Sequence, residues 1–315
     1  MIRRALITGI TGQDGSYLAE LLIEKGYEVY GMFRHTSTFN LDRLENIEPI
    51  TLLEADVTDF PSVLGVMSDS DPDEVYNLAA QSYVPTSWIQ PDLTMKVNAL
   101  GTLNILEAMR MSAKDIRFYQ ASSSEMFGNA PAPQNELTPL NPISPYAISK
   151  VAAHNLTKMY RDAFGMHCSC GICFNHESPR RGMEFVTKKI TATVADIKEG
   201  AIDKLRLGNL DAQRDWGYAG DYVKAMWLML QQDKPDDYVI ATGETHTVRE
   251  FVKAAFDCVG LDWREHVEID DEFKRPNEVN ILRGDASKAA RVLGWEPEVK
   301  FKELVEMISV LQVRM

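Results

Sequence analysis

The sequence predicts an α/β protein with a doubly wound parallel sheet followed by a smaller C-terminal domain. A short apolar run, Ala5-Leu6-Ile7-Thr8, leads through a glycine-rich turn into a segment with helical periodicity. Short apolar strands then alternate with helices as far as about residue 173, a pattern typical of parallel sheets with crossover helices. Beyond that point the alternation breaks down, and basic residues recur in an otherwise acidic chain.

The composition limits the classes of function that this chain can have. Its 315 residues are 45% hydrophobic and 25% charged, which allows a sizeable core in one large or two modest domains. The net charge of -13 argues against nucleic acid and anionic membranes as partners. No apolar run reaches the roughly 18 residues of a membrane span. The N-terminus enters a strand too soon for a signal peptide, so we expect a cytoplasmic protein.

The cysteines do not indicate a metal site. Cys168, Cys170 and Cys173 lie close together in a segment that alternates like a strand, and Cys258 stands apart. No C-x-x-C pair is matched by a second one, as a structural zinc site would require. We therefore expect free thiols and no bound metal.

The glycine-rich turn fits a dinucleotide. Gly9, Gly12 and Gly15 form a GxxGxxG pattern between the first strand and the first helix. Glycines at these places let the backbone turn tightly, approach a pyrophosphate and aim a helix N-terminus at it. A plain tight turn is the alternative, but the position between strand and helix favours a Rossmann-type dinucleotide site.

The end of the second predicted strand, 28–33, indicates which dinucleotide binds. NAD sites tend to place an acidic residue about 20 residues after the glycines, whereas this strand runs into Arg34. A guanidinium suits a 2′-phosphate, so NADP is favoured, with an exposed loop arginine as the alternative. The third predicted strand, 52–57, carries Asp56, which could accept a hydrogen bond from adenine. Small residues in the fourth, 74–80, leave room for a flat ring system.

A proton-transfer site is predicted between residues 122 and 150. Tyr146 and Lys150 are four residues apart, so on a helix the phenol and the ammonium lie on one face. A neighbouring cation favours the phenolate, which could exchange a proton with a substrate hydroxyl. Ser123 and Glu125 follow a buried strand, at the place where an open α/β sheet binds its ligand. Taken singly, these residues are more typical of a surface ion pair, an ordinary turn and a solvated helix start.

Basic residues in the C-terminal half favour an anionic small molecule such as a diphosphate. Lys188 and Lys189 open a helix, Arg214 follows a short strand, and Arg275 sits in a late loop. Scattered surface charge is the alternative. A further strand at 237–242 is expected to return to the sheet. The expected domains are an NADP-binding domain at 1–173, to which 215–245 returns, and a mainly substrate-binding domain at 174–315.

Taken in order, the glycine loop, the serine and the YxxxK pair resemble the extended short-chain dehydrogenase/reductase superfamily. Over almost its whole length, the chain is similar to the family of GDP-mannose 4,6-dehydratases. The longest and most specific stretch is FNHESPRRG, from Phe174 to Gly182. The other stretches that carry the resemblance are Gly9 to Gly15, Ser124-Glu125, Leu207-Gly208-Asn209, Arg214-Asp215-Trp216-Gly217 and Ile240-Ala241-Thr242-Gly243.

The resemblance implies an NADP-dependent lyase of deoxysugar metabolism that acts on GDP-mannose as a homodimer or homotetramer. Family tetramers use the loop after the second strand, here 34–43. The residues implied to bind NADP are Gly9, Ile10, Thr11, Gly12, Gln13, Asp14, Arg34, Asp56, Val57, Leu78, Ala79, Ala80, Gln81, Ser82, Tyr146, Lys150, His176 and Arg181. Those implied to hold the GDP-sugar are Ser82, Glu125, Asn175, Lys189, Arg214, Arg275 and Glu278.

This sequence departs from the family pattern at two positions. The family usually has threonine where this chain has Ser123, a change that keeps the hydroxyl. It usually has a double arginine where this chain has Arg34-His35.

The implied reaction is an internal redox loss of water that converts GDP-mannose to GDP-4-dehydro-6-deoxy-mannose. Tyr146, with Lys150 and Ser123, is expected to take the C4 hydroxyl proton, and Glu125 to remove the C5 proton. A GDP-sugar 4-reductase or a nucleotide-sugar 4-epimerase has no C–H bond to deprotonate, so Glu125 separates dehydration from these alternatives. A catalytically silent, NADP-bound regulatory subunit is an alternative of a different class.

Overall fold

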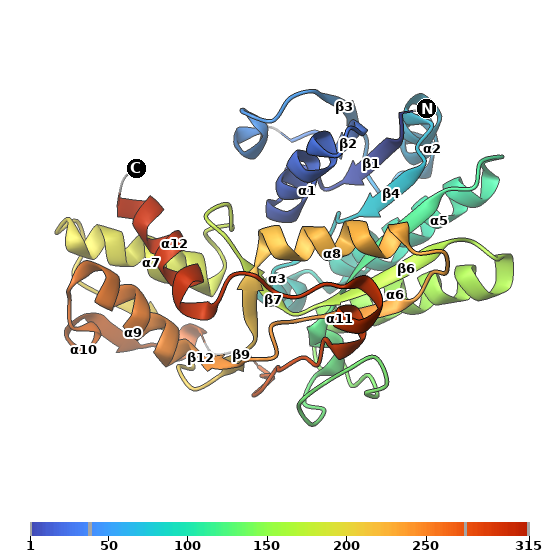
Figure 1. Cartoon of the computed structure of the whole chain (residues 1–315). Helices are drawn as coiled ribbons and strands as arrows, with labels where there is room; N and C mark the ends of the chain where they lie inside the picture. The colour runs from blue at the N-terminus through green and yellow to red at the C-terminus, as the bar shows by residue number, and fades with distance from the viewer. Residues whose placement is uncertain (1, 37–39, 274–275, 314–315) are drawn as a thin grey trace.

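A seven-stranded parallel sheet forms the centre of the larger lobe of the molecule (Figure 1). The computed structural model describes residues 2–36, 40–273 and 276–313. In spatial order, the strands are β3 (Ile50–Glu54), β2 (Glu28–Phe33), β1 (Arg4–Thr8), β4 (Glu74–Asn77), β5 (Arg117–Ser123), β6 (Cys168–Cys173) and β11 (Asp237–Ile240). Every neighbouring pair is parallel, which confirms the predicted doubly wound sheet.

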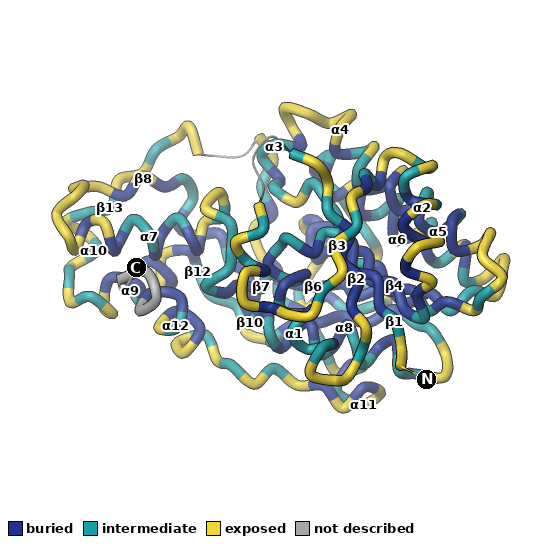
Figure 2. The backbone as a smooth tube through the Cα atoms, turned by 90° about the horizontal axis from the view of Figure 1, so that it is seen from above, coloured by how far each residue is buried: buried dark blue, intermediate teal, exposed yellow. Residues whose placement is uncertain are grey.

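Helices cover both faces of this sheet, so its inner strands are buried on both sides, whereas the edge strand β3 is partly exposed. Ala5 and Ile7 of β1 pack in the core on one face, and Leu6 packs in the core on the other. Figure 2 shows the central strands in the colour of buried residues. The helices of the first face are α1 (Gln13–Glu24), α8 (Ala219–Gln231) and α11 (Ser287–Leu293). Those of the second face are α2 (Phe60–Ser70), α5 (Gly101–Met111) and α6 (Pro145–Phe164).

Helix α6 has well-defined signals at both of its ends. The Ser144 hydroxyl accepts a hydrogen bond from the Ala147 N–H at 3.1 Å, and Pro145 occupies the first turn. Gly165 ends the helix with a φ of +67°, a conformation that favours glycine. These caps place Tyr146 in the first turn of the helix, at the carboxyl edge of the sheet.

Three elements differ from the sequence-based predictions. The strand predicted at 52–57 is β3 and ends at Glu54, because the Asp56 carboxylate accepts the Thr58 N–H at 2.8 Å and turns the chain. The strand predicted at 74–80 is β4 and ends at Asn77, where the Thr8 hydroxyl accepts the next two backbone N–H groups. Arg214 lies within a short strand, β9, instead of following one.

The smaller lobe has a core of its own, built by α7 (Val186–Lys198), α9 (Val248–Val259) and α12 (Phe301–Val313). Its helix α9 starts with a capping box formed by Thr247 and Glu250. Three two-stranded sheets complete the fold: β7 (Asn175–Glu177) with β10 (Trp216–Tyr218), β9 (Gln213–Arg214) with β12 (His246–Thr247), and β8 (Leu205–Leu207) with β13 (Val267–Ile269).

Short helical elements make up the remaining regular structure. They are η1 (Asp42–Leu44), α3 (Val84–Ile89), α4 (Pro91–Met95), the π-turn η2 (Lys96–Leu100), η3 (Ser124–Phe127), α10 (Trp263–His266) and η4 (Asp271–Phe273). Among the described residues, no helix is both long enough and apolar enough to cross a membrane.

Candidate active site

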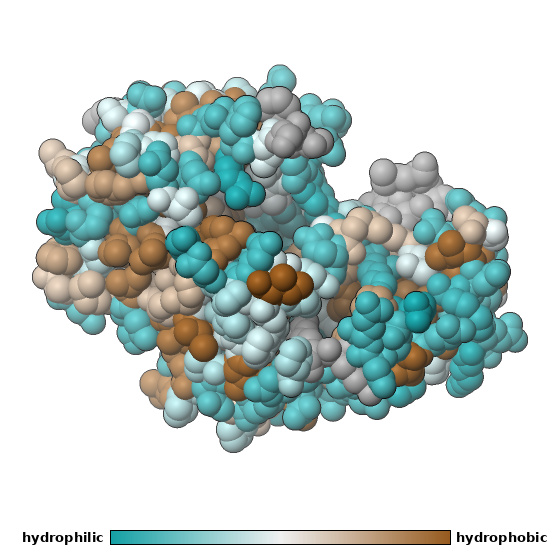
Figure 3. All heavy atoms as spheres, turned by 180° about the vertical axis from the view of Figure 1, so that it is seen from behind, coloured by the Kyte–Doolittle hydropathy of each residue, from teal (hydrophilic) through white to brown (hydrophobic). Residues whose placement is uncertain are grey.

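A cavity of about 680 Å³ lies between the carboxyl ends of the sheet strands and the smaller lobe. The sheet side is lined by the residues that follow β1, β4, β5 and β6, and the opposite wall includes residues of α7 and β9. Seen from behind, the molecular surface is notched between the two lobes (Figure 3). Open α/β sheets bind ligands at this edge, because the carboxyl ends of the strands meet there.

The glycine-rich turn has the shape that a dinucleotide pyrophosphate requires. Gly9 has a φ of +67°, and a Cβ at this position would lie 2.9 Å from the backbone of Ala79. A Cβ at Gly15 would lie 2.6 Å from the backbone of Ile10, so the turn packs directly on α1. Gly12 is the N-cap of α1 and lines the cavity. As a glycine, it has no side chain that could cap the backbone N–H groups of the first turn. The N-terminus of α1 is therefore available to an anion, and the cavity fits a dinucleotide.

Ser123, Tyr146 and Lys150 meet on one wall of the cavity. The Ser123 hydroxyl hydrogen-bonds the phenol of Tyr146. The ammonium of Lys150 donates to the carbonyl oxygen of Ala121 at 2.8 Å and lies 5.9 Å from the centre of the Tyr146 ring. The three side chains therefore hold a phenol between a hydroxyl and a cation, as proton transfer to or from a substrate hydroxyl requires.

The expectation that Lys150 brings the pKa of Tyr146 toward neutral pH is not met. Burial raises the pKa of Tyr146 to about 12, and the nearby Glu125 carboxylate adds to that rise against the Ser123 hydrogen bond. Burial also lowers the pKa of Lys150 to about 8. The reason is that both groups are removed from water, which penalises their charged forms.

Glu125 shares this wall with Tyr146. It belongs to η3, directly after β5, and its backbone N–H donates to the Ser123 hydroxyl at 3.2 Å. The residue lines the cavity and is only 9% exposed. A carboxylate next to the phenol gives the cavity a second proton-transfer group, which could act on a different atom of the same substrate.

A charged pair crosses from the first helix to the FNHESPRRG segment. His176 lies 2.8 Å from the Asp14 carboxylate through Nε2 and 2.7 Å from the Phe174 carbonyl oxygen through Nδ1. Its ring stacks on Tyr222. Arg181 pairs with the buried Glu177 carboxylate at 3.1 Å. His176 and Arg181 therefore line the cavity with side chains that their acidic partners hold in place.

The part of the cavity next to the smaller lobe contains several of the predicted substrate-binding residues. The ammonium of Lys189 donates to the Arg206 carbonyl oxygen at 2.8 Å and lies 3.5 Å from the ring centre of Phe273. The buried Arg214 guanidinium donates to the carbonyl oxygens of Gln213 and Val279. Two cations thus lie where a diphosphate could enter, in a chain with a net charge of -13.

Most of the residues predicted for the site line this one cavity. They are Gly9, Thr11, Gly12, Gln13, Asp14, Leu78, Ala79, Ala80, Ser82, Ser123, Glu125, Tyr146, Lys150, Asn175, His176, Arg181, Lys189, Arg214 and Glu278.

Five predicted cofactor residues do not line it. Ile10 packs in the core beside Gly31, and Val57 packs against Gly101. Gln81 bonds the backbone of Tyr83, Asp56 bonds Thr58, and Arg34 is exposed at the end of β2. Arg275 lies outside the described residues.

The sequence analysis missed two features of this cavity. Tyr83 and Phe185 both line it and pack edge to face, with ring centres 5.8 Å apart. Tyr83 comes directly after the predicted residue Ser82, and this adjacency was the available signal. Arg43 donates to the carbonyl oxygens of Thr11 and Arg180, and so ties the glycine loop to the FNHESPRRG segment. No sequence pattern indicates that contact.

Comparisons with known proteins agree with this geometry. A model of the GDP-mannose 4,6 dehydratase family matches residues 6–308. GDP-mannose 4,6 dehydratase 1 of Arabidopsis thaliana is 56% identical over 96% of this chain and 88% of its own length. The GDP-mannose 4,6 dehydratase of Drosophila melanogaster is 49% identical over 96% of this chain and 84% of its own length.

Solved structures extend the agreement to the whole fold. The UDP-glucose 4-epimerase of Thermotoga maritima, determined with UDP-glucose, superposes with a TM-score of 0.87, with 26% identity and 98% coverage of both chains. RMD of Pseudomonas aeruginosa, determined with NADPH, gives a TM-score of 0.82, with 25% identity and 99% coverage of both chains. With the family match and relatives of this similarity, the chain belongs to the GDP-mannose 4,6-dehydratase family.

Proposed function

We propose that this protein converts GDP-mannose to GDP-4-dehydro-6-deoxy-mannose and water. The observation that carries the proposal is the placement of Glu125 beside Tyr146 in the cavity, which adds a second base to the Ser123, Tyr146 and Lys150 set. The family membership supports the same reaction.

Each residue has a separate task in the proposed reaction. Tyr146, as the phenolate, takes the C4 hydroxyl proton and becomes a phenol, while Ser123 donates a hydrogen bond to the phenolate before the transfer. Lys150 supplies a positive charge next to that phenolate. Once C4 is a ketone, the C5 hydrogen is acidic; Glu125 removes it and returns a proton to the hydroxyl that leaves C6 as water. The proton that Tyr146 took from the C4 hydroxyl returns to C5 as C6 is reduced, so the product keeps its C4 ketone. A nicotinamide nucleotide, held by the glycine turn, would supply the redox chemistry that oxidation at C4 and reduction at C6 require.

The nicotinamide nucleotide is proposed to be NADP. Arg34 is exposed at the end of β2, where the 2′ position of the adenosine ribose lies in Rossmann-type sites. No acidic side chain occupies residues 34–36. The RMD structure, which this chain resembles, was determined with NADPH.

The protein is further proposed to form a homo-oligomer in the cytoplasm. Ile89, Leu100 and Ile148 are 79%, 51% and 49% exposed, and they lie on α3, η2 and α6, of which α6 contacts the other two. Neighbouring exposed apolar side chains of this kind are typical of a protein interface. Size-exclusion chromatography with light scattering tests this proposal, because a monomer at micromolar concentration would contradict it.

Incubation of the purified protein with GDP-mannose, without added reductant, tests the reaction. The dehydratase forms a 4-keto sugar that is lighter than the substrate by one water, with no net change in nicotinamide redox state. A 4-reductase acts only once NADPH is added and consumes it. A 4-epimerase yields a product of unchanged mass, and a silent subunit yields no product with or without NADPH. Any of these three results would overturn the proposal.

A further inference from the structure

Helix α6 carries a stripe of polar side chains that extends well beyond the cavity. Tyr146, Lys150, His154 and Arg161 fall within about 80° of one another on the helix, at about 100° per residue. The first two line the cavity, whereas His154 and Arg161 lie deeper along the sheet. The same helix face therefore holds the proposed proton-transfer groups at one end and a second polar cluster at the other.

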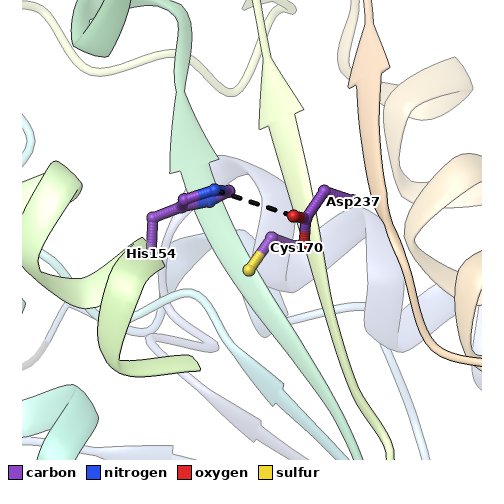
Figure 4. Close-up of side chains that lie close together, drawn as sticks. All are labelled: His154, Cys170 and Asp237. Atoms are coloured by element: carbon purple, nitrogen blue, oxygen red, sulfur yellow. Dashed lines mark ion pairs between the residues drawn. The ribbon is translucent and has the colours of Figure 1, made fainter. Parts of the chain in front are cut away.

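The second cluster joins α6 to three strands. Both terminal nitrogens of Arg161 bond the Asp237 carboxylate, at 3.0 and 3.2 Å, and one of them also bonds the Cys168 carbonyl oxygen. Asp237 opens β11, and its side chain is 11% exposed. His154 lies 3.0 Å from the Ser122 hydroxyl of β5 and 3.8 Å from the Asp237 carboxylate. Figure 4 shows His154 and Asp237 on either side of Cys170, which belongs to β6.

This cluster has the spacing of a metal site but not its electrostatics. The potential ligand atoms of His154, Cys170 and Asp237 lie within 4.8 Å of one another. However, Arg161 already binds both carboxylate oxygens of Asp237, and the ammonium of Lys158 lies 3.7 Å from one of them. Burial also raises the pKa of the Cys170 thiol well above its usual range. Because a metal ion would have to displace two cations and a proton, the cluster is a contact between helix and sheet.

We propose that the Arg161–Asp237 pair, supported by His154, fixes the register of α6 on the sheet and so positions Tyr146 and Lys150. A guanidinium that binds both oxygens of a carboxylate fixes the relative orientation of the two side chains as well as their distance. The ammonium of a lysine, which acts as a point charge, does not fix the orientation. The 15 residue-to-residue steps from Tyr146 to Arg161 span about 22 Å of helix, which moves as one body along its axis. A small displacement of α6 at the Arg161–Asp237 pair would therefore displace the Tyr146 phenol by the same amount. The inference rests on the proposed dehydration, in which a misplacement of about 1 Å slows the chemical step.

Arg161→Lys tests the anchor, because it keeps the charge and removes the fork. We expect kcat per NADPH-binding site to fall about tenfold, with the KM for GDP-mannose and the Kd for NADPH changed less than twofold. Lys158→Met is the matched control, since Lys158 lies on the same helix and faces the same carboxylate from a half-exposed position. Its kcat should stay within twofold of the wild type. Equal kcat values for the wild type and Arg161→Lys would overturn the inference.

The double variant Arg161→Met, Asp237→Leu separates positioning from stability. Replacing both members of a buried ion pair with apolar residues often restores stability, whereas removal of one member does not. We expect the double variant to melt close to the wild type and to keep the lowered kcat. Recovery of kcat together with the melting temperature would show that the pair only stabilises the fold, and would overturn the inference. Absence of 4-keto sugar with the wild type itself would instead refute the proposed reaction.

Discussion

The imidazole of His176 and the carboxylate of Asp14 form an ion pair, with 2.8 Å between Nε2 and Oδ2. The other ring nitrogen faces the Phe174 carbonyl oxygen, so both nitrogens donate and the ring carries its charge. Burial opposes that charge, but Asp14 outweighs it and raises the pKa of His176. Burial likewise opposes the carboxylate, yet His176 lowers the pKa of Asp14 to about 2. The pair therefore locks the first turn of α1 to a segment 162 residues later in the chain.

The first prediction concerns the stability that this pair supplies. The Asp14 contribution is present above about pH 4 and is lost as pH falls through about 2. The His176 contribution is present below about pH 6.5, the usual histidine pKa, and is lost as pH rises through its raised value. Asp14→Asn should lower the free energy of unfolding by about 2 kcal/mol near pH 6 and by less near pH 9. Urea denaturation at both pH values measures this, and an equal loss at both would contradict it.

The second prediction concerns the base that makes the reaction a dehydration. Glu125→Gln keeps the shape of the side chain and removes its basicity, so water loss should slow about a thousandfold. Because Tyr146 and Lys150 remain, oxidation at C4 should still occur and reduced nicotinamide should accumulate, which its absorbance reports. Glu184→Gln is the control, since Glu184 also lines the cavity but is exposed. Undiminished 4-keto sugar formation by Glu125→Gln would refute the role of Glu125.

The third prediction is a loss of activity in mild alkali. Burial lowers the pKa of Lys150 to about 8, so the free enzyme loses this cation above that pH. If the ammonium supports the Tyr146 phenolate, kcat/KM of the wild type should fall above about pH 8 relative to that of Lys150→Arg. Lys150→Arg should be slower but lack this fall, because a guanidinium stays charged. A ratio of the two kcat/KM values that stays constant to about pH 10 would exclude the role of the ammonium.

Much of the fold could be predicted because its signals are local. The glycine turn after the first strand and the alternation of strands and helices depend on neighbouring residues, and the structure confirms the sheet that they predict. The caps of α6 are also local, and they fix where Tyr146 and Lys150 begin. The meeting of Ser123 and Glu125 with this pair could be expected because parallel strands end at a common edge.

The remaining features depend on contacts between distant segments. Nothing in the sequence joins Asp14 to His176, or Arg161 to Asp237, because these pairs form only when the sheet is complete. The pKa of Tyr146 was missed for a related reason. The spacing to Lys150 indicated a stabilising cation, whereas the larger effect is burial, which spacing does not report.

The fourth prediction concerns a carboxylate that holds two loops together. Asp215 is fully buried and accepts hydrogen bonds from the backbone N–H groups of Thr242, Gly243 and Gly284. Asp215→Ala leaves these donors without their acceptor, so it should lower the free energy of unfolding by about 3 kcal/mol. Asp211→Ala removes an exposed ion pair with Arg249 and should cost less than about 0.5 kcal/mol. Similar losses in the two variants, measured by urea denaturation, would contradict this account.

The fifth prediction tests the choice between NADP and NAD. Arg34 is exposed at the end of β2, where we propose that its guanidinium binds the 2′-phosphate of NADP. Arg34→Ala should therefore raise the Kd for NADPH at least tenfold and leave that for NADH unchanged, since one charged hydrogen bond contributes about 1.5–3 kcal/mol. Arg4→Ala is the control, because Arg4 starts β1 at the opposite edge of the sheet, where it pairs with Glu28. Titration with each dinucleotide measures the two affinities. Equal weakening of NADPH and NADH binding would show that Arg34 does not bind the 2′-phosphate. A preference for NADP would then have to come from another cationic side chain.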